Sequence, residues 1–314
     1  MQEIIPRVDR ALIKAELTPE RFLRHTNKGG NEIYCGTAAQ MPNCMREIAR
    51  LREITFRASS GGTGKEMDLD EFDTMENPYI QLFVWDAQAE EILGGYRYIF
   101  GNTVGFLPDG QPNLCTGEIL EFSDRFIRDY LPYTVELGRS FVQPDYQSTK
   151  MGAKSLFALD NLWDGLGAVF VNHPQMKYCF GKMTLYPSYN GAARDLIFGF
   201  LAKQFQDTEG LVSAKQPFPQ VMTPGEAEAL FPFEDFKENY KILNREVRAL
   251  GVNVPPLVNA YMGLSPKMRY FGSAVCHSFG EVIECGILVP LNEIYEEKKQ
   301  RHIDTYLEEL KARK

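Results

Sequence analysis

The chain has 314 residues, 44% of them hydrophobic and 24% charged, and its formal net charge is −8. This composition is ordinary for a soluble globular protein with a sizeable core, and the negative charge argues against a general nucleic-acid binder, which needs a broad basic surface. No run of about 18 apolar residues is present, so no transmembrane helix is expected. Because residues 1–7 lack a secretory signal pattern, we expect a cytoplasmic protein.

The six cysteines form no C-x-x-C pair and stand at no zinc-finger spacing from the four histidines. This scatter predicts buried free thiols rather than a zinc site or a disulfide framework. Cys276 and His277 are not expected to form a catalytic pair, because adjacent residues on a strand point to opposite faces.

The first part of the chain predicts helices and then a β-hairpin. Thr18-Pro19-Glu20 has the pattern of a helix start, and apolar residues at helical spacing predict a helix over 43–57. The glycine-rich loop 60–65 lacks the spacing of a phosphate-binding P-loop, so it is expected only to connect elements. Segments 80–85 and 92–100 flank a short polar turn and predict two paired strands.

Strands and helices follow one another in the second part of the chain. The predicted strands are 134–142, 177–185, 270–276 and 282–289, and the predicted helices are 149–171, 192–205, 236–250 and one that starts at Thr223. The tail 292–314 is a heavily charged helix, which is expected to lie on the surface. This order predicts an α/β fold with a mixed central sheet flanked by helices.

The most informative segment runs from a strand that carries Glu136 and Arg139, through a turn at Pro144, into a helix. A strand that leads into a helix N-terminus is a common phosphate-binding arrangement, because the free amides and the helix dipole favour an anion. The predicted cradle consists of the backbone amides of Gly152 and Ala153 with Ser148, Thr149 and Lys150. The alternative is a well-capped helix without a ligand.

The segment from Glu136 to Ala153 resembles the acyl-carrier binding segment of the GNAT (N-acetyltransferase-like) superfamily. That superfamily's Q/R-x-x-G-x-G/A pattern is kept at Gln147 and Gly152, whereas Lys150 replaces the inner glycine. The resemblance implies a GNAT-like fold, with an acyltransferase core over 1–205 and a C-terminal extension over 206–314 that completes the same fold. It also implies that Phe141, Val142 and Gln147 help to bind the donor.

Five further pieces are similar to the ornithine or glycine acyl-carrier-protein N-acyltransferases, a hemolysin-like family related to acyl-homoserine-lactone synthases. They are residues 51–56, 68–73, 94–97, 136–139 and 255–264. The resemblance implies transfer of a 3-hydroxy long-chain fatty acyl group from acyl carrier protein to the α-amine of glycine or ornithine. The product would be an N-acyl amino acid, a precursor of aminolipids.

No permanently bound cofactor is expected, and the acyl donor is the phosphopantetheine of acyl carrier protein or coenzyme A. Lys150 in place of a glycine favours the carrier protein. The predicted partners are therefore acyl carrier protein and a small amino acid; a peripheral membrane contact is left open, and no nucleic acid is expected. The alternatives are a signal synthase of the acyl-homoserine-lactone type that uses S-adenosylmethionine, and a non-enzymatic membrane-binding protein.

Glu136 and Arg139 are the predicted catalytic residues. A partly desolvated carboxylate on a central strand is suited to accept the amine proton, whereas a structural ion pair with an arginine is the alternative role of Glu136. Residues three apart on a regular strand point to opposite faces. The two side chains therefore share a site only if the strand carries a bulge, which Gly138 favours.

Arg52 and Arg97 are candidates for binding the acceptor carboxylate, because a guanidinium forms a bidentate pair with it. A structural salt bridge to the acidic cluster Asp68, Asp70 and Asp73 is an equally weighted alternative. That cluster lacks the glycine and the distal glutamate of a calcium loop, so we expect no metal there. Asp70 and Asp73 are expected to order the loop or to recognise the acceptor, and the resemblance adds Phe56 to the substrate-binding residues.

Overall fold

The computed structural model describes residues 1–147 and 153–312, with only the backbone of residues 153–156. The chain divides into two compact units, each described by itself. Unit 1 contains residues 1–105, 132–177 and 296–314, and unit 2 contains residues 106–131 and 178–295. The division of the chain into an acyltransferase core over 1–205 and an extension over 206–314 stays a prediction.

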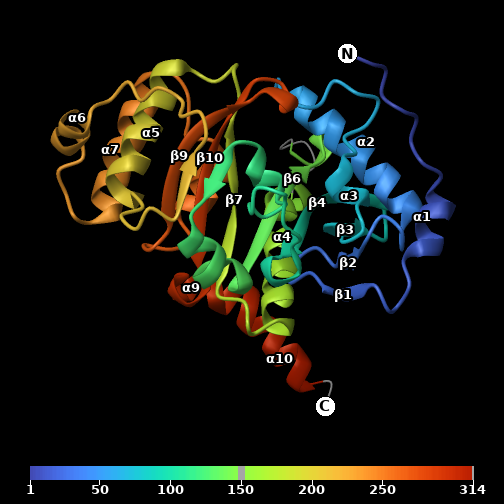
Figure 1. Cartoon of the computed structure of the whole chain (residues 1–314). Helices are drawn as coiled ribbons and strands as arrows, with labels where there is room; N and C mark the ends of the chain where they lie inside the picture. Colours follow the sequence, from blue (N-terminus) through green and yellow to red (C-terminus); the bar gives the residue numbers. More distant parts are fainter. Residues whose placement is uncertain (148–152, 313–314) are drawn as a thin grey trace. The chain divides into compact units, whose positions relative to one another are not determined.

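Unit 1 contains five neighbouring strands in the order β1-β2-β3-β4-β6, paired antiparallel (Figure 1). These strands are β1 (Phe22–His25), β2 (Glu32–Gly36), β3 (Ile80–Asp86), β4 (Glu91–Phe100) and β6 (Thr134–Val142). Its α-helices are α1 (Arg10–Glu16), α2 (Pro42–Ala58), α3 (Glu71–Thr74), α4 (Ala153–Asn172), α9 (Glu296–Lys299) and α10 (Thr305–Ala312). A π-helical turn at Gln300–Asp304 joins the last two.

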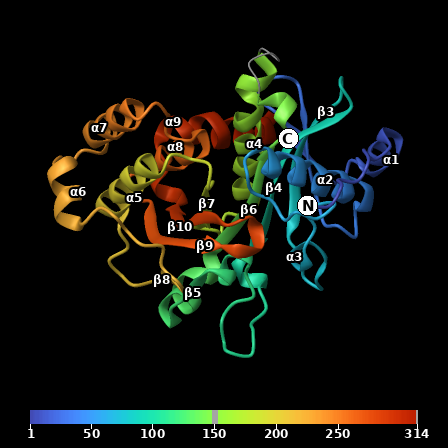
Figure 2. The ribbon, with the colours of Figure 1, turned by 90° about the horizontal axis from the view of Figure 1, so that it is seen from above.

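Helices α2 and α4 cover opposite faces of β4. The side chain of Tyr96 packs against Trp163 of α4, with ring centroids 6.5 Å apart. The next residue, Arg97, shares Asp73 as an ion-pair partner with Arg52 of α2. Successive strand residues point to opposite faces, which is consistent with Figure 2, where β4 lies between α4 and α2. The α2 face of β4 is therefore the one that carries Arg97 and its ion pairs.

Unit 2 contains three neighbouring strands in the order β7-β10-β9, also antiparallel. These are β7 (Tyr178–Leu185), β10 (Val282–Pro290) and β9 (Arg269–Cys276), and a separate ladder joins β5 (Leu120–Phe122) to β8 (Val212–Ala214). The helices are α5 (Gly191–Phe205), α6 (Pro224–Leu230), α7 (Phe236–Ala249) and α8 (Pro256–Met262). Phe180 of β7 is 1% exposed and packs against Phe122, Phe126 and Phe271, which shows where the core of this unit lies.

The predicted strands are confirmed within two residues at either end, and the predicted helices are confirmed where the chain is described, with two exceptions. The tail predicted as a surface helix over 292–314 begins its α-helix only at Glu296, and its His302 and Tyr306 are buried. The pattern at Thr18 does not begin a helix. Its carbonyl accepts hydrogen bonds from the backbone amides of Arg21 and Phe22, which close a turn directly before β1. The pairing of Phe22 with Tyr34 of β2 outweighs the local helix-start pattern.

The glycine-rich loop 60–65 is wrapped around a buried carboxylate. Glu53 of α2 is fully buried and accepts hydrogen bonds from the backbone amides of Thr63 at 3.0 Å and Gly64 at 2.8 Å. Gly62 and Gly64 have φ angles of 92° and 73°, a conformation that favours glycine. The loop therefore binds an anion that the protein itself supplies, which agrees with the prediction that it is not a P-loop.

All six cysteines are free, and five of them are buried, as predicted. Burial raises the pKa of the Cys35 and Cys285 thiols to about 12. These two thiols therefore stay protonated near neutral pH and are poor nucleophiles. None of the described helices is long and apolar enough to span a bilayer.

Candidate active site

Strand β6 carries a bulge directly after Gly138. Gly95 and Arg97 of β4 are two positions apart in the chain. Their partners on β6, Phe141 and Gly138, are three positions apart, so β6 carries one extra residue here. The extra residue re-aims the side chains around it. Arg139 takes up the distortion with a φ of 49°, a left-handed conformation that is costly for a residue with a side chain. The bulge that the sequence analysis required is therefore confirmed, although Arg139 and not Gly138 is the left-handed residue.

The bulge brings Glu136 and Arg139 to the same face of the sheet. Glu136 lies opposite Ile99 of β4, two residues from Arg97, so Glu136 shares the face of Arg97. Arg139 reaches Asp70, which also pairs with Arg97. Both predicted catalytic side chains are consequently on the α2 face.

Glu136 is 2% exposed, and its carboxylate accepts a hydrogen bond from the hydroxyl of Tyr79. Tyr79 comes directly before β3 and is fully buried. Its ring lies against the guanidinium of Arg97, 5.1 Å from the centroid, and edge-on to Phe72. The carboxylate is therefore buried and is held by a buried phenol.

Three arginines and three aspartates form a buried charge network next to Glu136. Arg52 donates from Nε to Asp68 at 3.0 Å and forms a bidentate pair with Asp73 at 3.2 Å. Arg97 pairs with Asp70 at 2.6 Å and with Asp73 at 3.1 Å. Because each guanidinium meets more than one carboxylate, the network holds its members in fixed positions.

Arg139 joins the network from β6. Its Nε lies 2.9 Å from Asp68, and its Nη2 lies 3.4 Å from Asp70. These contacts fix the guanidinium of a residue whose backbone is in the left-handed conformation. The bulge and the network therefore support each other.

The network keeps its two buried aspartates, Asp68 and Asp73, ionised. Burial alone would raise the pKa of Asp68, but Arg139 and Arg52 outweigh burial and lower that pKa. Burial has the same tendency at Asp73, where Arg52 and Arg97 also reverse it and hold the pKa well below its usual value. Asp68 and Asp73 are therefore anions at neutral pH.

Only one edge of the network reaches the surface. The side chains of Asp70 and Arg139 are 24% and 13% exposed, whereas those of Arg97 and Asp73 are fully buried. A small ligand can meet the network only at this edge unless the protein rearranges.

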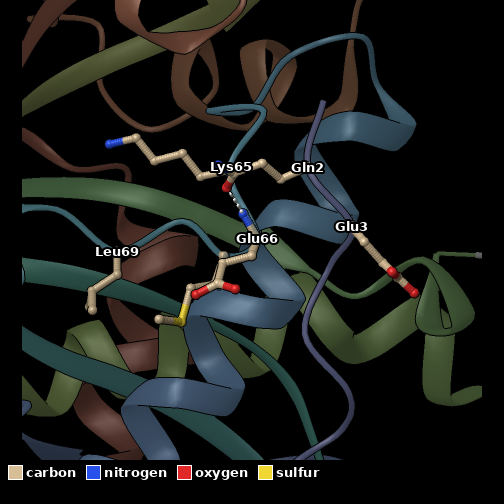
Figure 3. Close-up of a pocket in the computed structure, with 6 residues that line it drawn as sticks. Gln2, Glu3, Lys65, Glu66 and Leu69 are labelled. Carbon is tan, nitrogen blue, oxygen red and sulfur yellow. Dashed lines mark hydrogen bonds between the residues drawn. The ribbon is translucent and has the colours of Figure 1, made fainter.

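A cavity of about 560 Å³ lies elsewhere in unit 1, between the N-terminal segment and the loop before α3. In Figure 3 the backbone amide of Glu66 donates to the side chain of Gln2, while the Lys65 and Glu3 side chains extend away from each other. Neither Glu136 nor Arg139 lines this cavity. It therefore adds no group to the site on β6.

Comparison with known proteins identifies the family. Residues 51–156, which include the second half of α2 and all of β3, β4 and β6, match the model of the acetyltransferase (GNAT) domain. A glycine N(alpha)-acyltransferase of Bacteroides thetaiotaomicron is 58% identical over 308 residues, with 98% of this chain and 91% of the relative covered. A glycine N(alpha)-acyltransferase of Phocaeicola vulgatus is 56% identical over 309 residues, with 98% and 95% covered.

The chain belongs to the glycine N(alpha)-acyltransferase family. It is an acyltransferase with a GNAT-like α/β fold, as the resemblance implied. A solved coenzyme-A-dependent acyl-homoserine lactone synthase is 13% identical, with 49% of this chain and 67% of that chain covered, at a TM-score of 0.29. A second structure of that enzyme, with S-adenosylmethionine and isopentyl-CoA, is 14% identical at the same TM-score.

Six of the predicted site residues lie together in the candidate site. Glu136, Arg139, Arg97, Arg52, Asp70 and Asp73 all lie on the α2 face. The structural salt bridges that were the alternative for Arg52 and Arg97 are present, which favours a structural role for these two arginines over contact with the acceptor. Phe56 of α2 is 5% exposed and belongs to the core of unit 1.

The predicted donor-binding residues are described only in part. Phe141 is 3% exposed on β6, and Gln147 donates to the carbonyl of Val142 at 2.5 Å. Lys150 and Gly152, with Ser148 and Thr149, lie outside the described residues, and only the backbone of Ala153 is described. The phosphate cradle therefore stays a prediction.

Two buried polar residues of the site were missed in the sequence. Tyr79 bonds Glu136, and Gln81 of β3 donates to Asp73 at 2.9 Å. Gln81 offered a signal, because it is a polar residue directly before the apolar run of β3. Tyr79 offered none, because an aromatic residue beside a strand is ordinary.

The described residues contain no cluster of three or more histidine, cysteine, aspartate or glutamate side chains with the geometry of a metal site. The three aspartates of the network instead face guanidinium groups.

Proposed function

We propose that this acyltransferase moves a 3-hydroxy long-chain fatty acyl group from the thioester of acyl carrier protein to the α-amine of glycine. Glycine is the acceptor in the names of the two curated relatives, which match 98% of the chain. The observation that carries the mechanism is the bulge in β6. It gives one face a buried carboxylate at Glu136 and, at Arg139, a guanidinium that reaches the surface.

In the proposed reaction, the neutral amine attacks the thioester carbonyl carbon. The new carbon–nitrogen bond forms, the carbon–sulfur bond breaks, and the carrier thiol leaves. Glu136 accepts the proton that the amine loses, directly or through a water, and the leaving thiolate takes up that proton. The carboxylate is in hydrogen-bond contact with a phenol and 2% exposed, which is a suitable place for a general base.

We assign the acceptor carboxylate to the exposed edge of the charge network. Arg139 supplies the guanidinium, and Asp70 beside it excludes acceptors with an additional negative charge. Arg52 and Arg97 are too enclosed to bind glycine directly and act by holding the aspartates in place. Buried thiols with raised pKa values favour direct attack by the amine over an acyl-cysteine intermediate.

The donor is tested by a direct competition. Purified protein is incubated with glycine and either acyl carrier protein or coenzyme A carrying the same 3-hydroxy acyl chain, and N-acyl glycine is measured by mass spectrometry. Product from the carrier protein at a kcat/KM at least about tenfold higher supports the proposed donor. Equal or better use of the coenzyme A thioester contradicts it, and a panel with ornithine, alanine and serine tests the acceptor.

The base is tested by Glu136→Gln, which keeps the shape of the side chain and removes its basicity. We expect turnover to fall by about 10²- to 10⁴-fold with unchanged donor binding. Glu32→Gln is the matched control, because Glu32 also accepts a hydrogen bond from a tyrosine, at 2.8 Å, but lies on β2. Near-normal turnover of Glu136→Gln would remove Glu136 from this role.

A further inference from the structure

Tyr79 is one of the two buried polar residues of the site that the sequence analysis missed. Its hydroxyl donates to Glu136, and its side chain is fully buried. Its backbone amide donates to the carbonyl of Phe72 at 2.8 Å, which ties the start of β3 to the segment that carries Asp70 and Asp73. The phenol therefore links the carboxylate on β6 to the charge network.

The ring of Tyr79 is fixed on two sides. The guanidinium of Arg97 lies 5.1 Å from its centroid, and the ring of Phe72 meets it edge-on at 5.7 Å. Arg97 is itself held by Asp70 and Asp73. Because the ring has little freedom to turn, its hydroxyl presents a hydrogen-bond donor to Glu136 in a defined direction.

We propose that Tyr79 is a positioning residue for the general base: its hydroxyl orients the Glu136 carboxylate and keeps it ionised, ready to accept the amine proton. This inference rests on the proposed function of Glu136. A hydrogen bond to the ionised form of a carboxyl group favours that form, and burial of the carboxylate opposes it. The phenol thus offsets the effect of burial without adding a charge.

The ion pairs on this face do not involve the Tyr79 hydroxyl. Helix α2, strand β4 and β6 itself pack together here, along with the segment that leads into α3. Their charged side chains on this face are Arg52, Arg97, Arg139, Asp68, Asp70 and Asp73. All six are paired within the network, and none of the pairs uses the Tyr79 hydroxyl.

The test is the pH dependence of kcat/KM for Tyr79→Phe with glycine and the donor that the wild type uses. Phenylalanine keeps the ring, and with it the contact to Arg97, and removes only the donor. We expect the acid limb that belongs to Glu136 to move up by about one to two pH units. The amine of glycine titrates identically in both proteins, so it cancels from the difference. Above the limb, the variant should regain most of the wild-type rate.

Tyr34→Phe is the matched control. Tyr34 is 7% exposed and donates to Glu32 at 2.8 Å in the same unit, on β2 rather than beside β6. This variant loses the same kind of hydrogen bond, and its acid limb should coincide with that of the wild type. An equal shift in Tyr34→Phe would mean that the effect is general and would overturn the inference.

A double-mutant cycle separates positioning from mere stabilisation. If Tyr79 acts through Glu136, Tyr79→Phe should change the residual rate of Glu136→Gln by less than about twofold. Two results would overturn the role of Tyr79 while leaving Glu136 as the base: an acid limb of Tyr79→Phe that coincides with the wild type, or a large further loss of rate when Tyr79→Phe is added to Glu136→Gln. In both cases Glu136→Gln alone stays inactive. An active Glu136→Gln overturns the proposed base as well, so the two failures are distinguishable.

Discussion

Unit 1 buries arginines against aspartates, whereas unit 2 buries one lysine against one glutamate. In unit 1, Arg52 and Arg97 share Asp73 and reach further carboxylates. In unit 2, Lys182 of β7 pairs with Glu284 of β10, which also accepts from Thr184 at 3.4 Å. The difference matters because a lysine can lose its proton when its partner is removed, and an arginine cannot.

The two arrangements serve different ends. Burial would lower the pKa of Lys182, but Glu284 outweighs it and raises that pKa, so the pair is a closed unit of two charges. The network of unit 1 is open at Asp70 and Arg139, where it meets the surface. A simple pair of two largely buried charges suits structure, whereas an ordered network with an edge at Asp70, which is 24% exposed, suits recognition of a small charged ligand.

The largest effect should come from Asp73→Asn. The change leaves Arg52 and Arg97 buried with one anion fewer, and neither can deprotonate, so the free energy of unfolding should fall by about 3–5 kcal/mol. Urea unfolding followed by circular dichroism measures the change. Glu71→Gln, at an exposed position in the same short helix, is the control and should stay within about 0.5 kcal/mol. A small loss of unfolding free energy in Asp73→Asn would show that the ion pairs of Asp73 contribute little to stability.

Glu284→Gln should lower the free energy of unfolding by less, about 2–3 kcal/mol at pH 7, because Lys182 can lose its proton. The wild-type lysine has a raised folded pKa, so its contribution is present below the unfolded value and is lost as the pH rises through the folded one. In the variant the penalty for burying the ammonium disappears as the pH rises. The difference in unfolding free energy between the wild type and Glu284→Gln should therefore narrow from pH 7 to pH 10. The difference between the wild type and Asp73→Asn should not change over this range.

The network should lose stability in acid. The folded pKa of Asp73 is lowered, so its contribution is present above the unfolded value of about 3.9 and is lost as the pH falls towards the folded value. The difference in unfolding free energy between the wild type and Asp73→Asn should shrink by about 2 kcal/mol between pH 5 and pH 2. A constant difference over that range would mean that Asp73 is not held ionised by the arginines.

The smallest effect is expected for the double change Lys182→Met and Glu284→Leu. Replacement of a closed ion pair by apolar side chains of similar volume is often neutral, so the unfolding free energy should stay within about 1 kcal/mol of the wild type. Because neither residue belongs to the proposed site, N-acyl transfer should also continue. A loss of activity in a stably folded double variant would give unit 2 a role in catalysis and would break the comparison.

The sequence predicted the elements of the site better than their connections. Glu136, Arg139 and the acidic run were identified from residue type and order. The spacing of Glu136 and Arg139 also indicated that they could share a site only if the strand carried a bulge. Their partners could not be assigned, because Asp68 reaches Arg52 from 16 positions away along the chain and Arg139 from 71. Thr18 shows the reverse case, in which a clear local pattern gave way to strand pairing.

The sequence by itself determined the α/β class, the positions of most helices and strands, and the carboxylate and guanidinium on β6. These follow from hydrophobic periodicity and residue chemistry, which are local. Only the tertiary structure decided that Arg139 turns onto the face of Glu136, that Arg52 and Arg97 are enclosed by aspartates, and that Tyr79 bonds Glu136. Those outcomes depend on which strands and loops meet across the fold, and contacts between distant residues leave no periodic trace in the chain.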